Sequence, residues 1–200
     1  MHTNIHANEF VPSDIKFTSA ATNDSFMLKP ANYNDGDIIA MDRAYIDYAK
    51  FEELTNRGVT YVTKMKKNLV YDTLSDTMYM LPCGLMECRV QVVEFRKHIK
   101  GGENIKHKAR IVTYVDPAKK KAKVISLLTN DMTMEVEDII DIYRQRWEIE
   151  LLFKQLKQNF PLKYFYGESA NAIKIQIWGT LIANLLLMVI KKRIKRSWSF

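Results

Sequence analysis

The sequence predicts a mixed α/β fold with a β-rich insertion in its middle and helices at its C-terminal end. Three observations predict it. An apolar run at 38–41, a helix at 47–57 and a second apolar run at 59–63 follow one another in βαβ order. The residues that follow contain several segments rich in alternating or β-branched side chains. Two long helical patterns come last. We therefore divide the chain into the first part of an α/β core at 1–68, a basic β-rich insertion at 69–130, and a helical part at 131–200.

The first part of the chain is expected to alternate strands with short helices. Strands are predicted at 2–7 and 14–21, joined by a turn at Pro12-Ser13. Asn23-Asp24-Ser25 is typical of a helix N-cap before a short apolar segment. The continuous apolar run at 38–41 is typical of a strand buried on both faces.

The insertion is predicted from four strand-like segments separated by proline and glycine. The segments are 77–82, 88–95, 108–115 and 123–128. The breaks between them are Pro82, Gly101-Gly102 and Asp116-Pro117. We interpret this region as a β-rich insertion that carries the main basic cluster.

The C-terminal part is predicted to hold two helices. Thr133 is expected to cap the first, which covers 138–160 and is ended by Pro161. The second covers about 170–196. Its longest apolar run, 177–190, is shorter than the roughly 20 residues that span a bilayer, so a buried helix is the favoured interpretation.

Positive charge is concentrated in two places. The chain has a formal net charge of +7. From Arg96 to Lys123 there are ten Lys and Arg against only two acidic residues, and 191–196 holds five more basic residues. Such segregation favours a polyanionic partner such as nucleic acid, because Lys and Arg near phosphates release condensed counterions. Two solvated charged faces are the alternative. Possible DNA contacts in the insertion are Lys119, Lys120 and Lys121.

Cysteine content and the N-terminus bear on the compartment. Cys83 and Cys88 are too few for a zinc site or a disulfide scaffold, which favours thiols in a reducing cytosol. No charged region followed by an apolar stretch opens the chain, so no secretory signal is expected. The expected location is cytoplasmic and, with a DNA partner, nucleoid-associated in a bacterium.

A stripe of four polar residues runs along the first long helix. At about 100° per residue, Tyr143, Arg146, Glu150 and Lys157 share an arc of about 60°. Apolar side chains flank the stripe, and unpaired charge inside an apolar zone is costly, which indicates a site. The alternative is a ladder of helix salt bridges, since Arg146 and Glu150 are four residues apart. Helical geometry alone leaves both interpretations open.

Asp42 follows the apolar run at 38–41, at the carboxyl end of the predicted strand. Open α/β sheets place ligands at this edge, and Mg²⁺ favours carboxylate and phosphate oxygens. Asp42 and a helix-borne Glu150 could therefore hold divalent ions for phosphodiester displacement. A helix N-cap, or an ion pair with Arg43, is the more common role for an Asp in this sequence context.

These residues resemble a known family. The stripe, Tyr143-x2-Arg146-x3-Glu150-x6-Lys157, has the spacing of the Y-R-E-K signature of DDE insertion-sequence transposases, specifically the large fourth insertion-sequence family. Met41-Asp42-Arg43-Ala44-Tyr45 resembles the second-aspartate motif of that family, and Leu127-Leu128-Thr129-Asn130 is also similar to it. The resemblance covers essentially the whole chain.

The resemblance implies a ribonuclease-H-like core interrupted by a β-rich insertion between the second and third acidic residues. It implies metal-dependent cleavage of double-stranded DNA at transposon ends and strand transfer into target DNA, by a homodimer when full length. Asp42 and Glu150 would be catalytic, each ligating one Mg²⁺, with Mn²⁺ as a substitute. The residues that would hold DNA phosphates are Tyr143, Arg146 and Lys157.

One element of the family pattern is not matched. The first aspartate should lie on a strand before 2–7, and neither Asp14 nor Asp24 matches its position. We therefore expect a truncated catalytic domain that is inactive alone. The alternative is a non-catalytic DNA-binding or dimerising remnant that modulates full-length transposase. Some family members hold a flipped base with an aromatic residue of the insertion; substitutes here would be Tyr79, Phe95 and Tyr114, each of which is more typical of a strand core.

Overall fold

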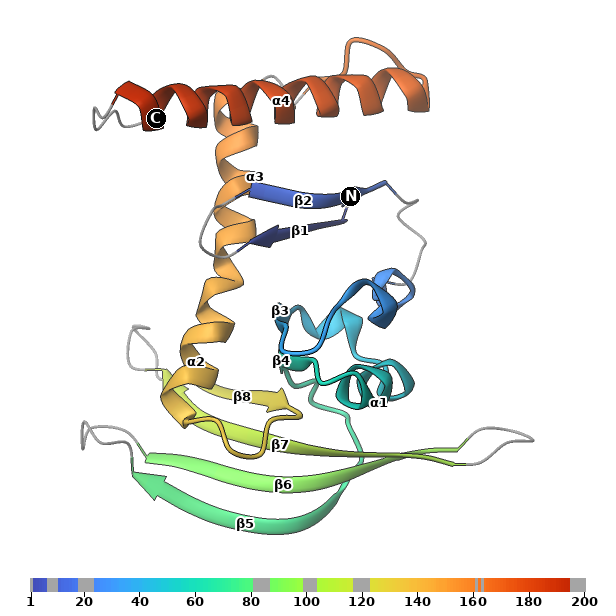
Figure 1. Cartoon of the computed structure of the whole chain (residues 1–200), viewed down its shortest axis with the longest axis vertical. Helices are drawn as coiled ribbons and strands as arrows, with labels where there is room; N and C mark the ends of the chain where they lie inside the picture. The colour runs from blue at the N-terminus through green and yellow to red at the C-terminus, as the bar shows by residue number, and fades with distance from the viewer. Residues whose placement is uncertain are drawn as a thin grey trace. The chain divides into compact units, whose positions relative to one another are not determined.

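The strands lie in two separate sheets, and the helices fall with them into two units (Figure 1). The computed structural model describes residues 2–6, 11–17, 24–80, 87–98, 104–116, 123–160, 162 and 164–194. Residues 21–146 form the larger unit, which we call the sheet unit. Residues 1–20 and 147–200 form the other, which we call the helical unit.

The sheet unit is built on one six-stranded sheet. Its strands, in spatial order, are β3 (Ile38–Met41), β4 (Thr60–Lys64), β8 (Lys123–Thr129), β7 (Ile105–Asp116), β6 (Glu87–Lys97) and β5 (Asp72–Met80). β3 and β4 run parallel, and every other neighbouring pair is antiparallel. The mixed α/β class is confirmed, and all four strands of the predicted insertion are present. These strands continue the sheet of β3 and β4, and β5 starts at Asp72 rather than at 77.

A helix packs on each face of this sheet. Phe51 and Leu54 of α1 (Tyr48–Asn56) pack with Tyr61, Ile111 and Leu128. On the opposite face, the buried residues of α2 (Val136–Gln145) pack with Val62, Val112 and Leu127. These three are the chain neighbours of Tyr61, Ile111 and Leu128. Successive strand residues point to opposite faces, so each run of apolar residues supplies both cores. β4 and β8 are therefore buried on both sides.

β3 does not have the two-sided burial predicted for it. Among the described strands it lies at the edge of the sheet, paired only with β4. Ile38 is 53% exposed, whereas Met41 at the other end is buried. The apolar run identified the strand correctly, but its place in the sheet depends on which strands pair with it.

Local signals set the ends of α1 as expected. The Asp47 carboxylate accepts a hydrogen bond of 3.1 Å from the Ala49 N–H and caps the helix. Gly58 ends it with a φ of 72°. This left-handed conformation favours glycine, and a Cβ at Gly58, 1.9 Å from Asp35 Oδ1, would also displace the Asp35 side chain. Shorter 3₁₀ helices are η1 (Asp24–Met27), where a cap was predicted, η2 (Pro30–Asn32) and η3 (Arg43–Tyr45).

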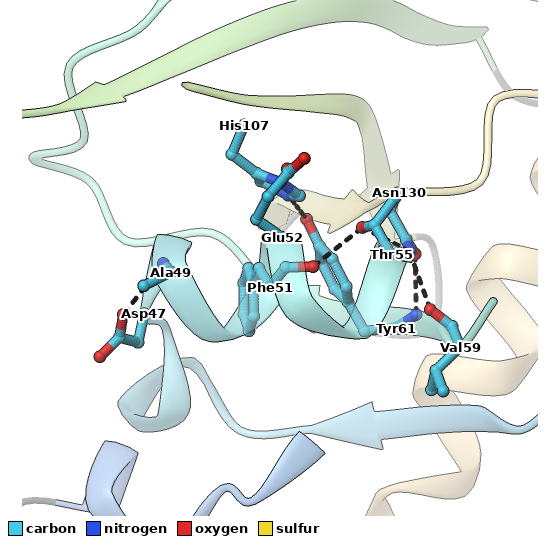
Figure 2. Close-up of polar contacts among 9 residues, drawn as sticks. All are labelled: Asp47, Ala49, Phe51, Glu52, Thr55, Val59, Tyr61, His107 and Asn130. Atoms are coloured by element: carbon cyan, nitrogen blue, oxygen red, sulfur yellow. Dashed lines mark hydrogen bonds and ion pairs between the residues drawn. The ribbon is translucent and has the colours of Figure 1, made fainter. Parts of the chain in front are cut away.

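A polar network joins α1, β4 and β7 inside the sheet unit (Figure 2). The buried His107 ring lies 2.7 Å from Glu52 Oε2 through Nδ1 and 2.6 Å from the Tyr61 hydroxyl through Nε2. Phe51 stacks on Tyr61 with ring centroids 4.0 Å apart. Asn130 accepts from the Tyr61 N–H and donates to Val59 O and to the Thr55 hydroxyl. Core and insertion strands are thereby tied into one unit.

The helical unit contains the second sheet and two helices. β1 (His2–His6) and β2 (Val11–Lys16) are antiparallel, with an irregularity between Asn4 and Ile5. Pro12 and Ser13 lie inside β2, so the turn predicted there is wrong. Leu152 and Leu156 of α3 (Trp147–Asn159) and Leu181 of α4 (Ala170–Ile194) form the core of this unit.

The single helix predicted over 138–160 is two helices. α2 ends at Gln145 and α3 begins at Trp147. At Arg146 the N–H donates to Tyr143 O at 3.2 Å, three residues back, where a continuous α-helix would bond four residues back. The regular hydrogen-bond pattern is therefore interrupted in the middle of the predicted stripe.

The predicted cap at Thr133 is also wrong. α2 starts at Val136, after Glu135. Asp131 Oδ1 instead accepts from the N–H groups of Thr133 and Met134, at 2.8 and 2.7 Å. The Thr133 hydroxyl also donates to Asp131 Oδ1, at 3.0 Å, so Thr133 belongs to a turn that precedes α2.

α4 differs from the buried helix that was expected. Residues Ala170–Lys191, 22 in number, are long and apolar enough to cross a membrane by length and composition, and only Thr180, Leu181 and Asn184 among them are buried. The helix has nearly the predicted bounds, but the predicted burial is wrong for most of it. Membrane spans and helices covered on all sides both have this length and composition.

Candidate active site

Asp42 lies where β3 ends and η3 begins. Its Oδ1 accepts a 2.9 Å hydrogen bond from the Ala44 N–H and so caps η3, as one of the two sequence interpretations proposed. Oδ2 lies 3.9 Å from Nη1 of Arg146, and the Asp42 side chain is 47% exposed. One oxygen thus holds the carboxylate in place, and the other faces a cation across the site.

Arg146 and Tyr143 lie beside Asp42 in the same unit. The Arg146 guanidinium carbon lies 5.5 Å from the centroid of the Tyr143 ring, a cation–π distance. The Arg146 side chain is only 16% exposed, while Tyr143 is half-buried and packs against the core on the α2 face. The interruption between α2 and α3 places Arg146 at the end of the helix, next to a carboxylate from a distant part of the chain.

Glu150 and Lys157 lie on α3 in the helical unit. They are separated by seven residues, which places them on the same side of the helix about 10 Å apart along its axis. Both line a hollow of about 920 Å³ together with Lys154 and Phe153. The remaining lining residues are Gln158, Asn159, Phe160 and Tyr164.

The predicted residues thus fall into two groups. Asp42, Tyr143 and Arg146 come together in the sheet unit, and Glu150 and Lys157 share a hollow in the helical unit. Glu150 and Lys157 are exposed, so the expectation that they are embedded in an apolar zone is wrong for both. On α3 the buried side chains are instead Leu152 and Leu156, which form the apolar face of that helix.

Other residues singled out in the sequence have mixed outcomes. Lys119, Lys120 and Lys121 lie outside the described residues. Phe95 and Tyr114 are core residues, as expected, with exposures of 0% and 3%. Tyr79 is not: it is 36% exposed on β5. Cys88 is a buried free thiol.

Sequence reasoning missed basic side chains close to Asp42. Arg43, Lys66 and Lys67 line a second hollow, of about 500 Å³, in the sheet unit. A signal for them was present, because Lys66 and Lys67 follow β4, which runs parallel to β3. The carboxyl ends of parallel strands meet at one edge of a sheet, so residues after β4 belong beside Asp42 and Arg43.

The two predicted acids, Asp42 and Glu150, do not belong to a preformed cluster of metal-ligating side chains among the described residues. Within the described ranges no group of three or more His, Cys, Asp or Glu side chains could hold a metal. Asp42 and Glu150 each offer hard oxygen donors of the kind Mg²⁺ prefers, and Asp42 Oδ2 accepts no hydrogen bond within the unit from the residues described. Both residues thus carry the donor type that Mg²⁺ prefers, without further acidic ligands grouped around either in the described part of the chain.

Comparison with known proteins identifies the family of the chain. Residues 1–186 match the model of a protein family described as "Transposase DDE domain". The chain belongs to the transposase DDE domain family. The resemblance to DDE transposases is therefore confirmed at the level of the family.

Three members resemble the chain over most of its length. "Putative transposase y4zB" of Sinorhizobium fredii is 25% identical, covering 94% of this chain and 52% of that protein. "Putative transposase for insertion sequence element IS4SA" of Synechocystis sp. is 29% identical over 78% of this chain and 42% of that protein. "Probable transposase for insertion sequence element IS5377" of Geobacillus stearothermophilus is 23% identical over 94% of this chain and 48% of that protein. The chain spans about half the length of these relatives.

Proposed function

We propose that this chain forms the part of an insertion-sequence transposase catalytic domain that carries the second and third acids, Asp42 and Glu150. The observation that carries the proposal is the meeting of Asp42 with Arg146 and Tyr143 at the end of β3, although α2 and β3 are far apart in the sequence. A strand-end carboxylate beside a phosphate-capable guanidinium suits phosphodiester chemistry. The proposed fold is ribonuclease-H-like, and the proposed subgroup is the fourth insertion-sequence family.

Asp42 and Glu150 would hold divalent ions, Mg²⁺ or Mn²⁺. Bound there, such ions would activate the attacking oxygen and neutralise charge at the leaving oxygen. The part played by Asp42 follows from its two oxygens. The Ala44 N–H holds Oδ1, which keeps the carboxylate in one orientation, and Oδ2 is the oxygen turned toward the site.

Arg146, Tyr143 and Lys157 would position the DNA. The Arg146 guanidinium can donate two parallel hydrogen bonds to one phosphate. It lies over the Tyr143 ring and beside Asp42, which limits its orientations before DNA arrives. Lys157 would supply a point charge from the hollow it shares with Glu150.

The proposal includes partners and location. Double-stranded DNA, as transposon ends and as target, would be the substrate, and the full-length protein would pair two ends as a homodimer. The protein would act in the bacterial cytoplasm, at the nucleoid.

The test is cleavage of a labelled transposon end by the chain joined to a strand that supplies the first acid of the family. With Mg²⁺ or Mn²⁺, we expect cleavage that Glu150→Gln or Asp42→Asn lowers by more than about 100-fold, because a metal ligand is removed. Binding of the same DNA, measured by fluorescence anisotropy, should change little. Glu168→Gln removes an exposed carboxylate outside both groups and serves as the matched control.

Equal cleavage by Glu150→Gln and the unmodified protein would contradict the catalytic assignment. DNA binding by the 200-residue chain, measured by the same anisotropy assay, helps to separate a catalytic-domain fragment from a non-catalytic remnant. Salt-sensitive binding without cleavage by any extended form would favour a non-catalytic remnant.

A further inference from the structure

A basic hollow lies at the carboxyl ends of β3 and β4. It has a volume of about 500 Å³ and is lined by Arg43, Lys66, Lys67, Asn68 and Leu69. Arg43 opens η3 directly after β3, and Lys66 and Lys67 follow β4 in the parallel neighbour strand. Open α/β sheets bind ligands at this edge.

The charged residues that line the hollow are all basic. Three cations line it and no carboxylate does. None of the three forms an ion pair with a carboxylate of the described residues. Elsewhere in the sheet unit exposed basic residues do pair with acids: Arg89 with Asp76, Arg96 with Glu94 and Asp72, Lys97 with Asp47, and Arg144 with Asp141. A concave surface of one sign attracts and concentrates ions of the opposite sign.

The backbone around the hollow is held in place. The Met65 N–H donates to Ser126 O at 2.9 Å, and Met65 and Leu69 both pack against the core on the α1 face. On the other side, Asp42 caps the turn that carries Arg43, and Tyr45 packs on the same core. The backbone that carries the three basic side chains is thus held in place, which lowers the conformational entropy that ligand binding must overcome.

We propose that Arg43, Lys66 and Lys67 bind a backbone phosphate of DNA. Arg43 can grip two phosphate oxygens, and the lysines add point charges. Because Arg43 directly follows Asp42, this phosphate site adjoins the carboxylate proposed to be catalytic, and it is additional to the phosphate contacts of Tyr143, Arg146 and Lys157. The inference rests on the proposed function, since it assumes a DNA substrate. The strand could belong to the transposon end or to the target, and both present the same phosphodiester.

The first test maps the site on the unmodified 200-residue chain. Lysines are acetylated with and without a duplex oligonucleotide, and the modification of each is measured by mass spectrometry. We expect acetylation of Lys66 and Lys67 to fall severalfold with DNA, while that of Lys29, an exposed lysine away from the hollow, stays the same. Running the test with transposon-end DNA and with unrelated DNA separates the two sources. Protection by the end sequence alone assigns the site to the transposon end, and equal protection by both assigns it to DNA of any sequence.

The second test measures the electrostatic contribution of the hollow. Arg43→Gln/Lys66→Gln/Lys67→Gln should lower the slope of log K against log salt concentration by about 0.9 for each phosphate that the variant no longer neutralises. Lys29→Gln/Arg57→Gln/Lys174→Gln removes the same charge from exposed positions outside the hollow and outside both basic clusters, and should leave the slope nearly unchanged. Equal urea midpoints for the two variants and the unmodified chain confirm that both are folded.

The outcomes distinguish this inference from the proposed function. DNA binding by the unmodified chain, with Lys66 and Lys67 unprotected and the slope retained in the hollow variant, would overturn the hollow alone. Failure of the unmodified chain to bind any DNA at about 50 mM salt, where phosphate contacts are strongest, would also overturn the hollow, while the proposed function would still be decided by the cleavage test of the extended chain.

Discussion

At the scale of single residues, His107 shows how burial sets the state of a titratable group. The side chain is fully buried in the network of Figure 2. Burial lowers the pKa of His107 from its usual 6.5, and the hydrogen bond and charge of Glu52 only partly oppose this. The neutral ring suits its neighbours, because Nδ1–H can donate to Glu52 while Nε2 accepts from the Tyr61 hydroxyl.

The pKa of His107 predicts a pH dependence of stability. The unfolded chain titrates near 6.5 and the folded chain lower, so the unfolded state binds more protons between the two values. The contribution of the neutral ring is therefore complete above pH 6.5 and falls as the pH drops toward the folded-state pKa. Urea unfolding from pH 8 to pH 5 should show stability decreasing below pH 6.5.

Single histidine substitutions show which residue causes the slope of stability against pH below pH 6.5. His107→Asn should flatten it, whereas His98→Asn, which changes an exposed ring, should leave it as it is. An unchanged slope in His107→Asn would mean that other groups control the acid response.

Residue roles differed in how far the sequence revealed them. A site role for Asp42 could be predicted from the sequence, because it is a polar residue directly after an apolar strand, where α/β sheets bind ligands. The partners of His107 were not, because Glu52 and Tyr61 meet it only through the pairing of β7 and the packing of α1. Lys66 and Lys67 were missed for a related reason: their position depends on which strand lies next to β3.

At the scale of elements, Asn130 links the end of β8 to α1 and β4. Its side chain makes hydrogen bonds of 2.9 Å with the Tyr61 N–H, 2.8 Å with Val59 O and 3.0 Å with the Thr55 hydroxyl. The segment that ends at Asn130 was noted in the sequence for its resemblance alone. The structure supplies a physical reason for an asparagine there, since the bonds need an acceptor and a two-proton donor on one short side chain.

Removing that link should destabilise the sheet unit. Asn130→Ala leaves the Tyr61 N–H and Val59 O without their partner, and an unsatisfied buried group costs about 1–3 kcal/mol. We expect a decrease of at least about 2 kcal/mol in the free energy of unfolding, measured by urea denaturation. Asn171→Ala, at an exposed position of α4, should change it by less than about 0.5 kcal/mol. If Asn130→Ala also lowered the free energy of unfolding by less than about 0.5 kcal/mol, water would have replaced the hydrogen bonds of the asparagine.

Strands were predicted more accurately than helix ends. All the strands of the insertion were found, because alternation of side chains is a local property. The break at Arg146 was not, since Tyr143–Lys157 has an unbroken helical pattern and contains no proline or glycine. The position of Arg146 next to Asp42 involves a residue about a hundred positions away, which no local pattern contains.

At the scale of the whole molecule, the two units have very different cores. The sheet unit contains two large clusters, one on each face of the sheet, and every residue of both lies within 21–146. The described part of the helical unit has one cluster with three buried residues, Leu152, Leu156 and Leu181. Burial of apolar surface is the main favourable contribution to folding, so the sheet unit should be the more stable of the two.

This difference predicts that residues 21–146 fold alone. The fragment should unfold cooperatively in urea and keep the acid destabilisation assigned to His107. A fragment of residues 147–200 should show no cooperative transition under the same conditions, because its core is too small. Loss of cooperativity in 21–146 would show that the sheet depends on the rest of the chain.

The sequence by itself determined the α/β class, the strands of the sheet unit, and the residue types and spacing that resemble those of the family. These are properties of neighbouring residues and of intervals along one element. Only the tertiary structure decided that Asp42 faces Arg146, that Glu150 and Lys157 are exposed along a hollow, and that Arg43 meets Lys66 and Lys67. Each of these depends on strand pairing, or on where a helix is interrupted and which of its faces is buried. Those choices are made by long-range packing, because side chains distant in the sequence become neighbours only when the sheet has formed.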